Sequence, residues 1–219
     1  QDGFTFDLGP TVMTMPELLD EPLRAAGSSQ EEAVPMRRLD PAYRGAFADG
    51  TELLVRGTPE DTAAEIARLA GPRDARAFLD LVPFLRELCE VELPNFIDHN
   101  FDSPAGLLHN PAAAARLLAM GGFSTLGSVI GKRIEDPRVR RMLTFQALYA
   151  GLRPDRALGI YAVITYMDTI RGVYLPEGGM GAVNDGLVAV VERLVDFHYG
   201  VTVTGLDRRA DGTVTGVRA

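Results

Sequence analysis

A helix start is marked four times in the middle of the chain by a Ser, Thr, Asn or Asp followed directly by proline. The four pairs are Thr58-Pro59, Ser103-Pro104, Asn110-Pro111 and Asp136-Pro137. The first residue of such a pair can cap the free N–H groups of a helix, and proline is well tolerated in the first helical turn. We therefore expect helices over most of residues 58–171, and no other feature constrains the fold as much.

Apolar residues inside this stretch repeat with a helical period. Ala63, Ile66 and Ala70 share one face of the first helix, which Gly71-Pro72 should end. The next helix carries a stripe formed by Phe78, Leu81, Val82, Leu85 and Leu88. Pro83 lies within this second helix and is expected to kink or divide it. Two more helices are expected, one from Asp136 to Gly151 and one over residues 155–172.

Strand patterns flank the helical middle. Residues 3–8 alternate apolar and polar side chains and end in a turn at Gly9-Pro10. Residues 43–57 form an expected hairpin around Asp49-Gly50, a favoured tight turn. After residue 172 the sequence predicts a short strand, a glycine-rich turn, a helix, and two strands around Asp211-Gly212. That order is typical of a βαβ-like unit, although one sequence leaves the pairing open. The fold class is therefore α/β in the sense of mixed α and β.

The joint that follows the last predicted helix is unusual. The helix passes Leu194–Val195 and enters the next strand without the turn residues that such a joint normally has. We therefore expect that residues are missing near 194–195.

Composition excludes several classes of function. The chain of 219 residues carries a formal net charge of -8 and shows no basic stripe, which argues against nucleic acid as a partner. Arginine far outnumbers lysine, which is typical of a GC-rich bacterial genome. The single Cys89 excludes an internal disulfide and fits a reducing, intracellular compartment. No apolar run reaches the length of a membrane-spanning helix, but peripheral contact with a membrane stays open.

The histidines and Cys89 do not indicate a catalytic or metal site. His99, His109 and His198 are scattered and lack a second set of ligands, so we expect no metal. Cys89 lies on an apolar helix and is expected to be a buried small side chain. The sequence also has no G-x-S-x-G esterase motif.

Three segments are candidates for binding or catalysis. Gly178-Gly179-Met180-Gly181 stands between a predicted strand and a helix, where backbone N–H groups can approach an anionic ligand. Gly9-Pro10 allows close approach of a ligand to the backbone. Asp136 and Arg140 lie one helical turn apart and could form a charged pair at the mouth of an apolar cavity. A plain turn, a strand end, and a helix cap with an exposed ion pair are the alternative interpretations.

Four segments, in the same order and with similar spacing, resemble the bacterial phytoene desaturase or carotenoid dehydrogenase family. They are GFTFDLGPTVMTMPELLDEPLRAAG near the start, RIEDPRVRRMLTFQALYAGLRP, IRGVYLPEGGMGAVNDGLVAVVERL, and GVTVTGLDRRADGTVTGVR. Their order and approximate spacing match the family along nearly the whole chain. The family belongs to the FAD-dependent amine-oxidase-like superfamily.

The resemblance implies an FAD-dependent oxidoreductase that desaturates a hydrophobic polyene such as phytoene, in the cytoplasm and peripheral to the inner face of the membrane. It implies that residues 1–12 and 172–219 belong to an FAD-binding domain and residues 13–171 to a substrate domain. Gly9, Pro10, Gly178 and Gly179 should lie near the cofactor, and the backbone at Val203 should face its adenine. Asp136 and Arg140 match a charged pair near the reacting centre.

The family also begins with a G-x-G-x-x-G turn that holds the FAD pyrophosphate, and this sequence contains none. We therefore expect an internal fragment of the parent enzyme that is inactive alone and does not retain FAD. Two alternatives stay open: a related flavoprotein acting on an amine or another lipid, and a non-enzymatic lipid-binding module.

Overall fold

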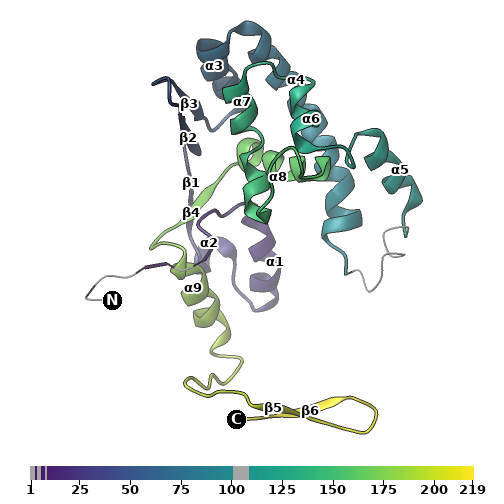
Figure 1. Cartoon of the computed structure of the whole chain (residues 1–219). Coiled ribbons are helices and arrows are strands. Elements are labelled where there is room, and N and C mark those ends of the chain that lie inside the picture. Colours follow the sequence, from purple (N-terminus) through teal and green to yellow (C-terminus); the bar gives the residue numbers. More distant parts are fainter. Residues whose placement is uncertain (1–2, 4–5, 8, 101–108) are drawn as a thin grey trace.

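The computed structural model describes residues 3, 6–7, 9–100 and 109–219, and it shows a mixed α and β fold (Figure 1). The helices between residues 59 and 171 form a helical body, which carries a β-hairpin on one side. Helices α1 (Glu17–Ala25), α2 (Gln30–Ala33) and α9 (Gly181–Val191) lie below this body, and a final hairpin extends away from them. The mixed α and β class predicted from the sequence is confirmed.

The first hairpin forms where Asp49-Gly50 predicts it. Strands β2 (Tyr43–Ala46) and β3 (Glu52–Val55) pair antiparallel, with Tyr43 opposite Val55. Gly50 turns the chain with a φ of 79°, a conformation that glycine adopts at little cost. Arg56, which directly follows β3, forms an ion pair of 2.9 Å with Glu65 and so joins the hairpin to the following helix.

Helices α3 (Pro59–Ala70) and α4 (Pro72–Glu92) form the centre of the helical body. The Thr58 hydroxyl accepts a hydrogen bond from the Asp61 N–H at 3.1 Å, as the cap prediction requires. Helix α4 continues through Pro83 as one element, so the proline does not divide it. The apolar stripe predicted for the second helix lies on α4 and is buried, and Phe78, Leu81 and Leu85 are fully inaccessible to solvent.

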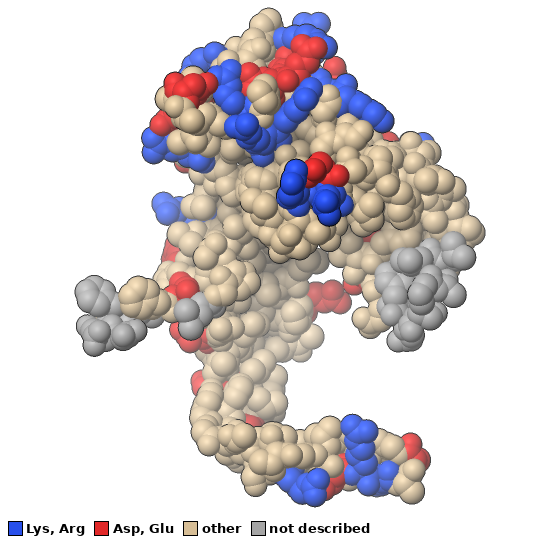
Figure 2. Space-filling model, in the orientation of Figure 1, with Lys and Arg blue, Asp and Glu red and all other residues tan. Residues whose placement is uncertain are grey.

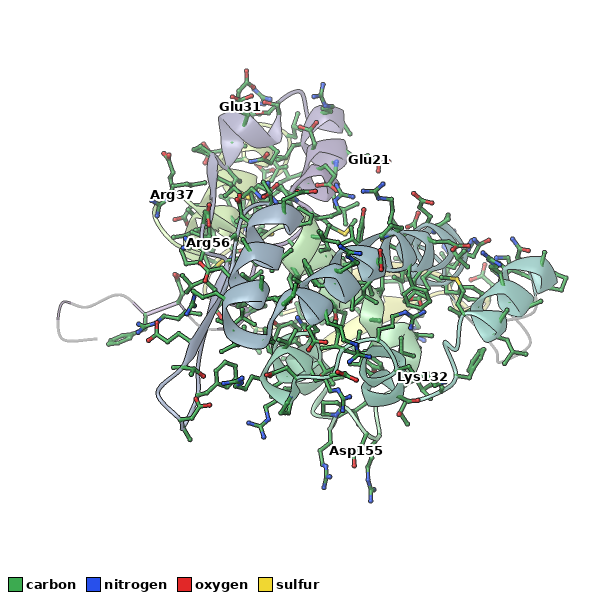
Figure 3. The ribbon with its side chains drawn as sticks, turned by 90° about the horizontal axis from the view of Figure 1, so that it is seen from above. Glu21, Glu31, Arg37, Arg56, Lys132 and Asp155 are labelled. Atoms are coloured by element: carbon green, nitrogen blue, oxygen red, sulfur yellow. The ribbon has the colours of Figure 1, made fainter. Side chains whose placement is uncertain are left out.

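Shorter helices complete the body. Asn110 caps α5 (Pro111–Ala119) and Asp136 caps α7 (Pro137–Met142), with α6 (Leu126–Gly131) between them. The start predicted at Ser103-Pro104 lies outside the described residues. In the view from above, the charged side chains of Glu21, Lys132 and Asp155 lie at the periphery (Figure 3).

Two predicted long helices are each divided into shorter pieces. The helix expected from Asp136 to Gly151 ends at Met142, and a 3-10 helix, η3 (Phe145–Ala150), follows it. The helix expected over 155–172 consists of η4 (Gly159–Tyr161), α8 (Ala162–Thr165) and a π-helix, η5 (Tyr166–Arg171). The glycines at 151 and 172 end these pieces with positive φ, so the predicted stops are correct.

The helical body is joined to the rest of the chain at one place. Strand β1 (Met36–Arg38) pairs antiparallel with β4 (Tyr174–Pro176). An isolated bridge links Met13 to Tyr174, whose N–H donates to the Met13 carbonyl at 2.8 Å. The segments through which the chain enters and leaves the helical body therefore lie next to each other.

The expected strand at 3–8 is not observed at Phe6 and Asp7, and its remaining residues apart from Gly3 lie outside the described part. Gly3 lies in a turn. Helix α9 forms as predicted and packs on α2. A side chain at Gly186 would collide with the Ala33 carbonyl oxygen, so the close approach of the two helices requires glycine.

The last hairpin consists of β5 (Gly205–Arg208) and β6 (Val214–Arg218), joined through Asp211-Gly212 as predicted. The segment 196–204 that leads to it has no regular structure. Among the described strands, β4 pairs with β1 and β5 pairs with β6. The βαβ order of the sequence therefore does not give a parallel pair in this structure.

Candidate functional site

The two glycine-containing segments predicted to bind a cofactor lie together, and Asp7 joins them. Its carboxylate accepts hydrogen bonds from the N–H of Met180 at 2.9 Å and of Gly181 at 3.0 Å. A Cβ at Gly179 would lie 2.7 Å from the carboxylate, and the φ of Gly179 is 93°. Glycine is therefore needed at position 179 both for conformation and for space. These two N–H groups at the start of α9 already have an acidic partner from within the chain.

Three hollows extend from this turn toward the helical body. The turn hollow, of about 400 Å³, is lined by Phe6, Asp7, Pro10, Met13, Met180, Gly181, Val183 and Asn184. The central hollow, of about 470 Å³, is lined by Gly9, Pro10, Thr11, Val12, Thr14, Tyr149, Ile164 and Asp168. The apolar hollow, of about 310 Å³, is lined by Glu92, Ile97, Ile160, Tyr161, Val163, Ile164 and Met167. Pro10 borders the first two and Ile164 borders the last two, so the three are neighbours in a row.

A buried polar cluster forms one wall of the central hollow. Asp168 is fully buried, and its carboxylate accepts hydrogen bonds from the Tyr43 hydroxyl at 3.1 Å, the Gln146 amide at 3.2 Å and the Thr169 hydroxyl at 3.0 Å. Burial raises the pKa of Asp168 to about 6, against the opposing effect of these donors. The Tyr149 hydroxyl lies 3.2 Å from the Tyr43 hydroxyl and extends the cluster to the surface. The carboxyl of Asp168 can therefore gain or lose a proton close to neutral pH.

A second buried carboxyl, that of Glu92, lines the apolar hollow. Glu92 is 3% exposed, and its Oε1 has no hydrogen-bond partner among the described residues. Burial raises its pKa to about 8, because an apolar environment disfavours the charged form. At neutral pH the protonated acid therefore predominates.

Sequence reasoning missed both carboxyls. Glu92 follows Leu88 by four residues and Leu85 by seven, so the stripe on α4 continues onto it. That spacing is the signal that could have placed Glu92 on the buried face. Asp168 lies in the π-helix η5, and such helices often mark functional sites. The sequence offers no comparable periodic signal for Asp168.

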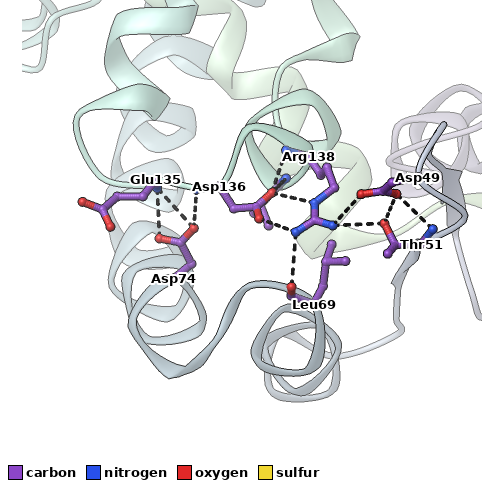
Figure 4. A network of polar contacts seen from close by, with 8 residues as sticks. Asp49, Thr51, Leu69, Asp74, Glu135, Asp136 and Arg138 are labelled. Atoms are coloured by element: carbon purple, nitrogen blue, oxygen red, sulfur yellow. Dashed lines mark hydrogen bonds and ion pairs between the residues drawn. The ribbon is translucent and has the colours of Figure 1, made fainter.

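The Asp136 carboxylate takes part in a different network at the far end of the body (Figure 4). It caps α7 by accepting from the Arg138 N–H at 2.7 Å and forms an ion pair of 2.7 Å with the Arg138 guanidinium. The hydrogen bond from that guanidinium lowers the pKa of Asp136. Arg138 also forms an ion pair with Asp49 at 2.9 Å. The partner predicted for Asp136 is therefore wrong, because Arg138 replaces Arg140.

Arg140 has a structural role of its own. Its guanidinium donates to the carbonyl oxygens of Ile134 at 2.6 Å and Gly131 at 3.1 Å, which fixes the chain between α6 and α7. Figure 1 shows α7 near the top of the molecule and α9 near the bottom. The structure therefore does not bring Asp136 and Arg140 together with Gly9 and Gly178.

Val203 also lies away from the other predicted cofactor residues. It is 56% exposed and belongs to the irregular segment that leads to β5. In Figure 1 this segment extends below α9, away from the helical body. Its predicted contact with a cofactor stays a prediction.

Two negative findings apply to the described residues alone. They contain no group of three or more His, Cys, Asp or Glu that could hold a metal ion. No helix among them is both long enough and apolar enough to cross a bilayer. Cys89 is buried as predicted, and burial raises the pKa of its thiol, which disfavours the reactive thiolate.

Comparison with known proteins gives consistent results. A family described as flavin containing amine oxidoreductase matches residues 1–218. The chain is 44% identical to a phytoene dehydrogenase of Streptomyces griseus over 210 residues, which is 95% of this chain and 41% of the relative. It is 29% identical over 203 residues to a zeta-carotene-forming phytoene desaturase of Myxococcus xanthus, covering 92% of this chain and 39% of that protein. It is 26% identical over 212 residues to a carotenoid 3,4-desaturase of Haloarcula japonica, covering 96% and 43%. The chain thus spans about two fifths of the length of these relatives.

Proposed function

The chain belongs to the flavin containing amine oxidoreductase family, and we propose that the whole protein is an FAD-dependent oxidoreductase that desaturates a carotenoid precursor such as phytoene. The names of its relatives support this activity, since they are phytoene and carotenoid desaturases. The resemblance seen in the sequence predicted the same family, and that prediction is confirmed. The substrate and the reaction remain our proposal for this chain.

The observation that carries the proposal is the row of three hollows. It runs from Gly9-Pro10, past Ile164, into the apolar hollow. A long hydrocarbon binds against apolar surface, and side chains such as Ile160, Val163 and Met167 supply such a surface in the apolar hollow. The helical body therefore has the surface chemistry that a polyene substrate requires.

The residues around the central hollow fit the ring of a flavin. Gly9 has a φ of 113°, and a Cβ built there would meet no atom within 4 Å, so its backbone is open to close approach. Pro10 and Ile164 offer apolar surface, while Asp168 and Tyr149 offer polar groups. When bound, the flavin would accept the hydrogen removed from the substrate. We propose Gly9 and Pro10 as its neighbours, with Gly178 and Gly179 at the joint between the domains.

The chain's own residues orient the substrate and exclude water. The Asp168 carboxyl is held by three donors, and it can hold a proton beside the hollow. Ile164 separates the two hollows and presents an apolar surface to each of them. These roles do not require a nucleophile or a metal among the described residues.

The domain boundaries are also part of the proposal. We assign residues 1–12 and 172–219 to an FAD-binding domain and residues 13–171 to a substrate domain. The bridge between Met13 and Tyr174 supports this division, because both crossings between the domains lie at one place. The backbone at Val203 is assigned to the adenine end of the cofactor. A hydrocarbon substrate dissolves in lipid, so we also assign the protein a peripheral position at the inner face of the cell membrane.

The experiment that tests the activity uses the full-length protein with phytoene in liposomes. We expect products with additional conjugated double bonds, which separate by chromatography and absorb at longer wavelength. A panel of amines tested in parallel separates the proposal from a related amine oxidase. Turnover of an amine without any desaturated phytoene would reject the proposal.

Residues 1–219 alone should not retain FAD. They contain no G-x-G-x-x-G, and Asp7 already occupies two N–H groups at the start of α9. We therefore expect this polypeptide, expressed by itself, to purify without yellow colour and without flavin absorbance. A stoichiometric flavin band in the purified sample would contradict this expectation.

A further inference from the structure

The carboxyl of Glu92 stands out among the buried acids of the described residues. Asp74 has the backbone N–H groups of Glu135 and Asp136 as partners, and Asp168 has three side-chain donors. The Oε1 of Glu92 has none, although the residue is only 3% exposed. The described part of the fold therefore leaves this oxygen without a hydrogen bond.

Its surroundings are almost entirely apolar. Apart from Glu92 and the hydroxyl of Tyr161, the hollow is lined by Ile97, Ile160, Val163, Ile164 and Met167. A buried polar atom without a hydrogen-bond partner destabilises the folded protein. A leucine or methionine would fill the same place without this cost. A carboxyl at this position is therefore explained if a bound molecule supplies the missing partner.

We propose that the apolar hollow binds the oxygen-bearing end of a long apolar molecule, with Glu92 as the hydrogen-bonding partner of a terminal hydroxyl or carbonyl oxygen. This assignment rests on the proposed function for the terpenoid character of the apolar part. It extends the proposed function to ligands that carry an oxygen at one end, because a pure hydrocarbon such as phytoene offers no oxygen to Glu92.

The direction of the hydrogen bond follows from the burial of Glu92. A neutral carboxylic acid has an O–H to donate, and a carbonyl or hydroxyl oxygen can accept it. A cationic amine would require the ionised carboxylate, which the apolar lining disfavours. The geometry therefore favours a neutral oxygen over an ammonium group.

Binding of a fluorescent polyene alcohol tests the assignment without any turnover. All-trans-retinol and its hydrocarbon counterpart axerophtene, which lacks the hydroxyl, would be titrated into the full-length protein. We expect the protein to bind retinol about tenfold more tightly than axerophtene, which corresponds to one hydrogen bond of roughly 1.4 kcal/mol. Equal affinity for the two probes would overturn the assignment.

Two variants locate the effect at Glu92. Glu92→Gln keeps a donor in the same place and should keep the preference for retinol. Glu92→Leu removes the donor and should bind both probes equally, while its thermal unfolding temperature should be no lower than that of the parent. Glu92→Met serves the same purpose if the leucine variant does not fold. A leucine or methionine variant that still prefers retinol would place the hydroxyl elsewhere and reject the role of Glu92.

Retinylamine provides a third arm. Tighter binding of this amine than of retinol would show that Glu92 pairs with a cation, contrary to the assignment. Failure of phytoene turnover in the parent protein would count against the proposed function alone, since the retinol and axerophtene titrations do not depend on it.

Discussion

The two ends of the helical body differ in the surroundings of their acidic side chains. At one end, Asp49, Asp74, Asp136 and Arg138 form a network in which every carboxylate has donors (Figure 4). At the other end, Asp168 and Glu92 border hollows and have raised pKa values. Figure 2 shows that Lys, Arg, Asp and Glu gather over the upper end of this face and again on the extension at the bottom, whereas the region between them is mostly uncharged.

The difference separates a structural role from a binding role. A carboxylate with N–H and guanidinium partners stabilises the connections between α4, α7 and the first hairpin and has little capacity left for a ligand. A buried carboxyl with weak or missing partners lowers the stability of the empty protein and can interact with a bound molecule. The charged network around Asp136 thus fits a structural role, while the two buried acids that border hollows mark the candidate site.

The largest effect is expected at Asp74. Replacing Asp74 with alanine leaves the backbone N–H groups of Glu135 and Asp136 without their acceptor, which should lower the free energy of unfolding by about 3–4 kcal/mol. Urea denaturation measures this change. As a matched control, Asp155→Ala removes an exposed ion pair with Arg153 and should change stability by less than about 0.5 kcal/mol. Similar values for the two variants would show that the network is not structural.

A smaller effect is expected from the pH dependence of stability. Glu92 has a folded-state pKa of about 8 against an ordinary 4.5, so the folded protein binds the proton more tightly than the unfolded chain. The stability linked to this proton is fully present below pH 4.5 and is lost as pH rises through 8. The corresponding loss for Asp168 is largely complete near its pKa of about 6.

The window from pH 6 to 8 therefore isolates Glu92. Over this window the parent protein should lose about 2 kcal/mol of unfolding free energy that Glu92→Gln does not lose. Urea denaturation of both proteins at several pH values measures the difference. Parallel curves for the two proteins would mean that Glu92 is ionised in the folded state, and the contrast between the two ends would then weaken.

The smallest effect is expected at Asp136. Asparagine keeps the cap of α7 and removes only the charge that pairs with Arg138, so Asp136→Asn should cost about 1 kcal/mol. The same variant tests the catalytic role that the sequence predicts for this residue. A scaffold role requires phytoene turnover in the full-length enzyme to fall no further than the loss of folded protein explains. Abolished turnover in a stably folded variant would instead support the catalytic prediction.

Features fixed by neighbouring residues could be predicted from the sequence. The caps at Thr58, Asn110 and Asp136 and the turns at Gly50 and Gly212 depend on local backbone chemistry, and all five are observed. The breaks inside the helices expected over 137–151 and 155–172 were not predicted, because tertiary packing overrides local helical preference there.

The parts of the candidate site that depend on contacts between distant residues could not be predicted from the sequence. The contact of Asp7 with Met180 joins residues 173 positions apart, and the bond of Tyr43 to Asp168 spans 125 positions. The partner of Asp136 was mistaken because Arg138 also reaches Asp49 on the hairpin, a contact that helical spacing does not reveal. Sequence alone therefore singled out the two glycine-containing turns but not the acids that border the hollows.

The bridge between Met13 and Tyr174 has a practical consequence. Because one hydrogen bond joins residues 13 and 174, a pair of cuts there would release the helical body in one piece together with α1, α2 and β1. A matching pair of cuts in another member of the family would let the same block of residues be exchanged, and the replacement must bring a helix that packs as closely on Gly186 of α9 as α2 does.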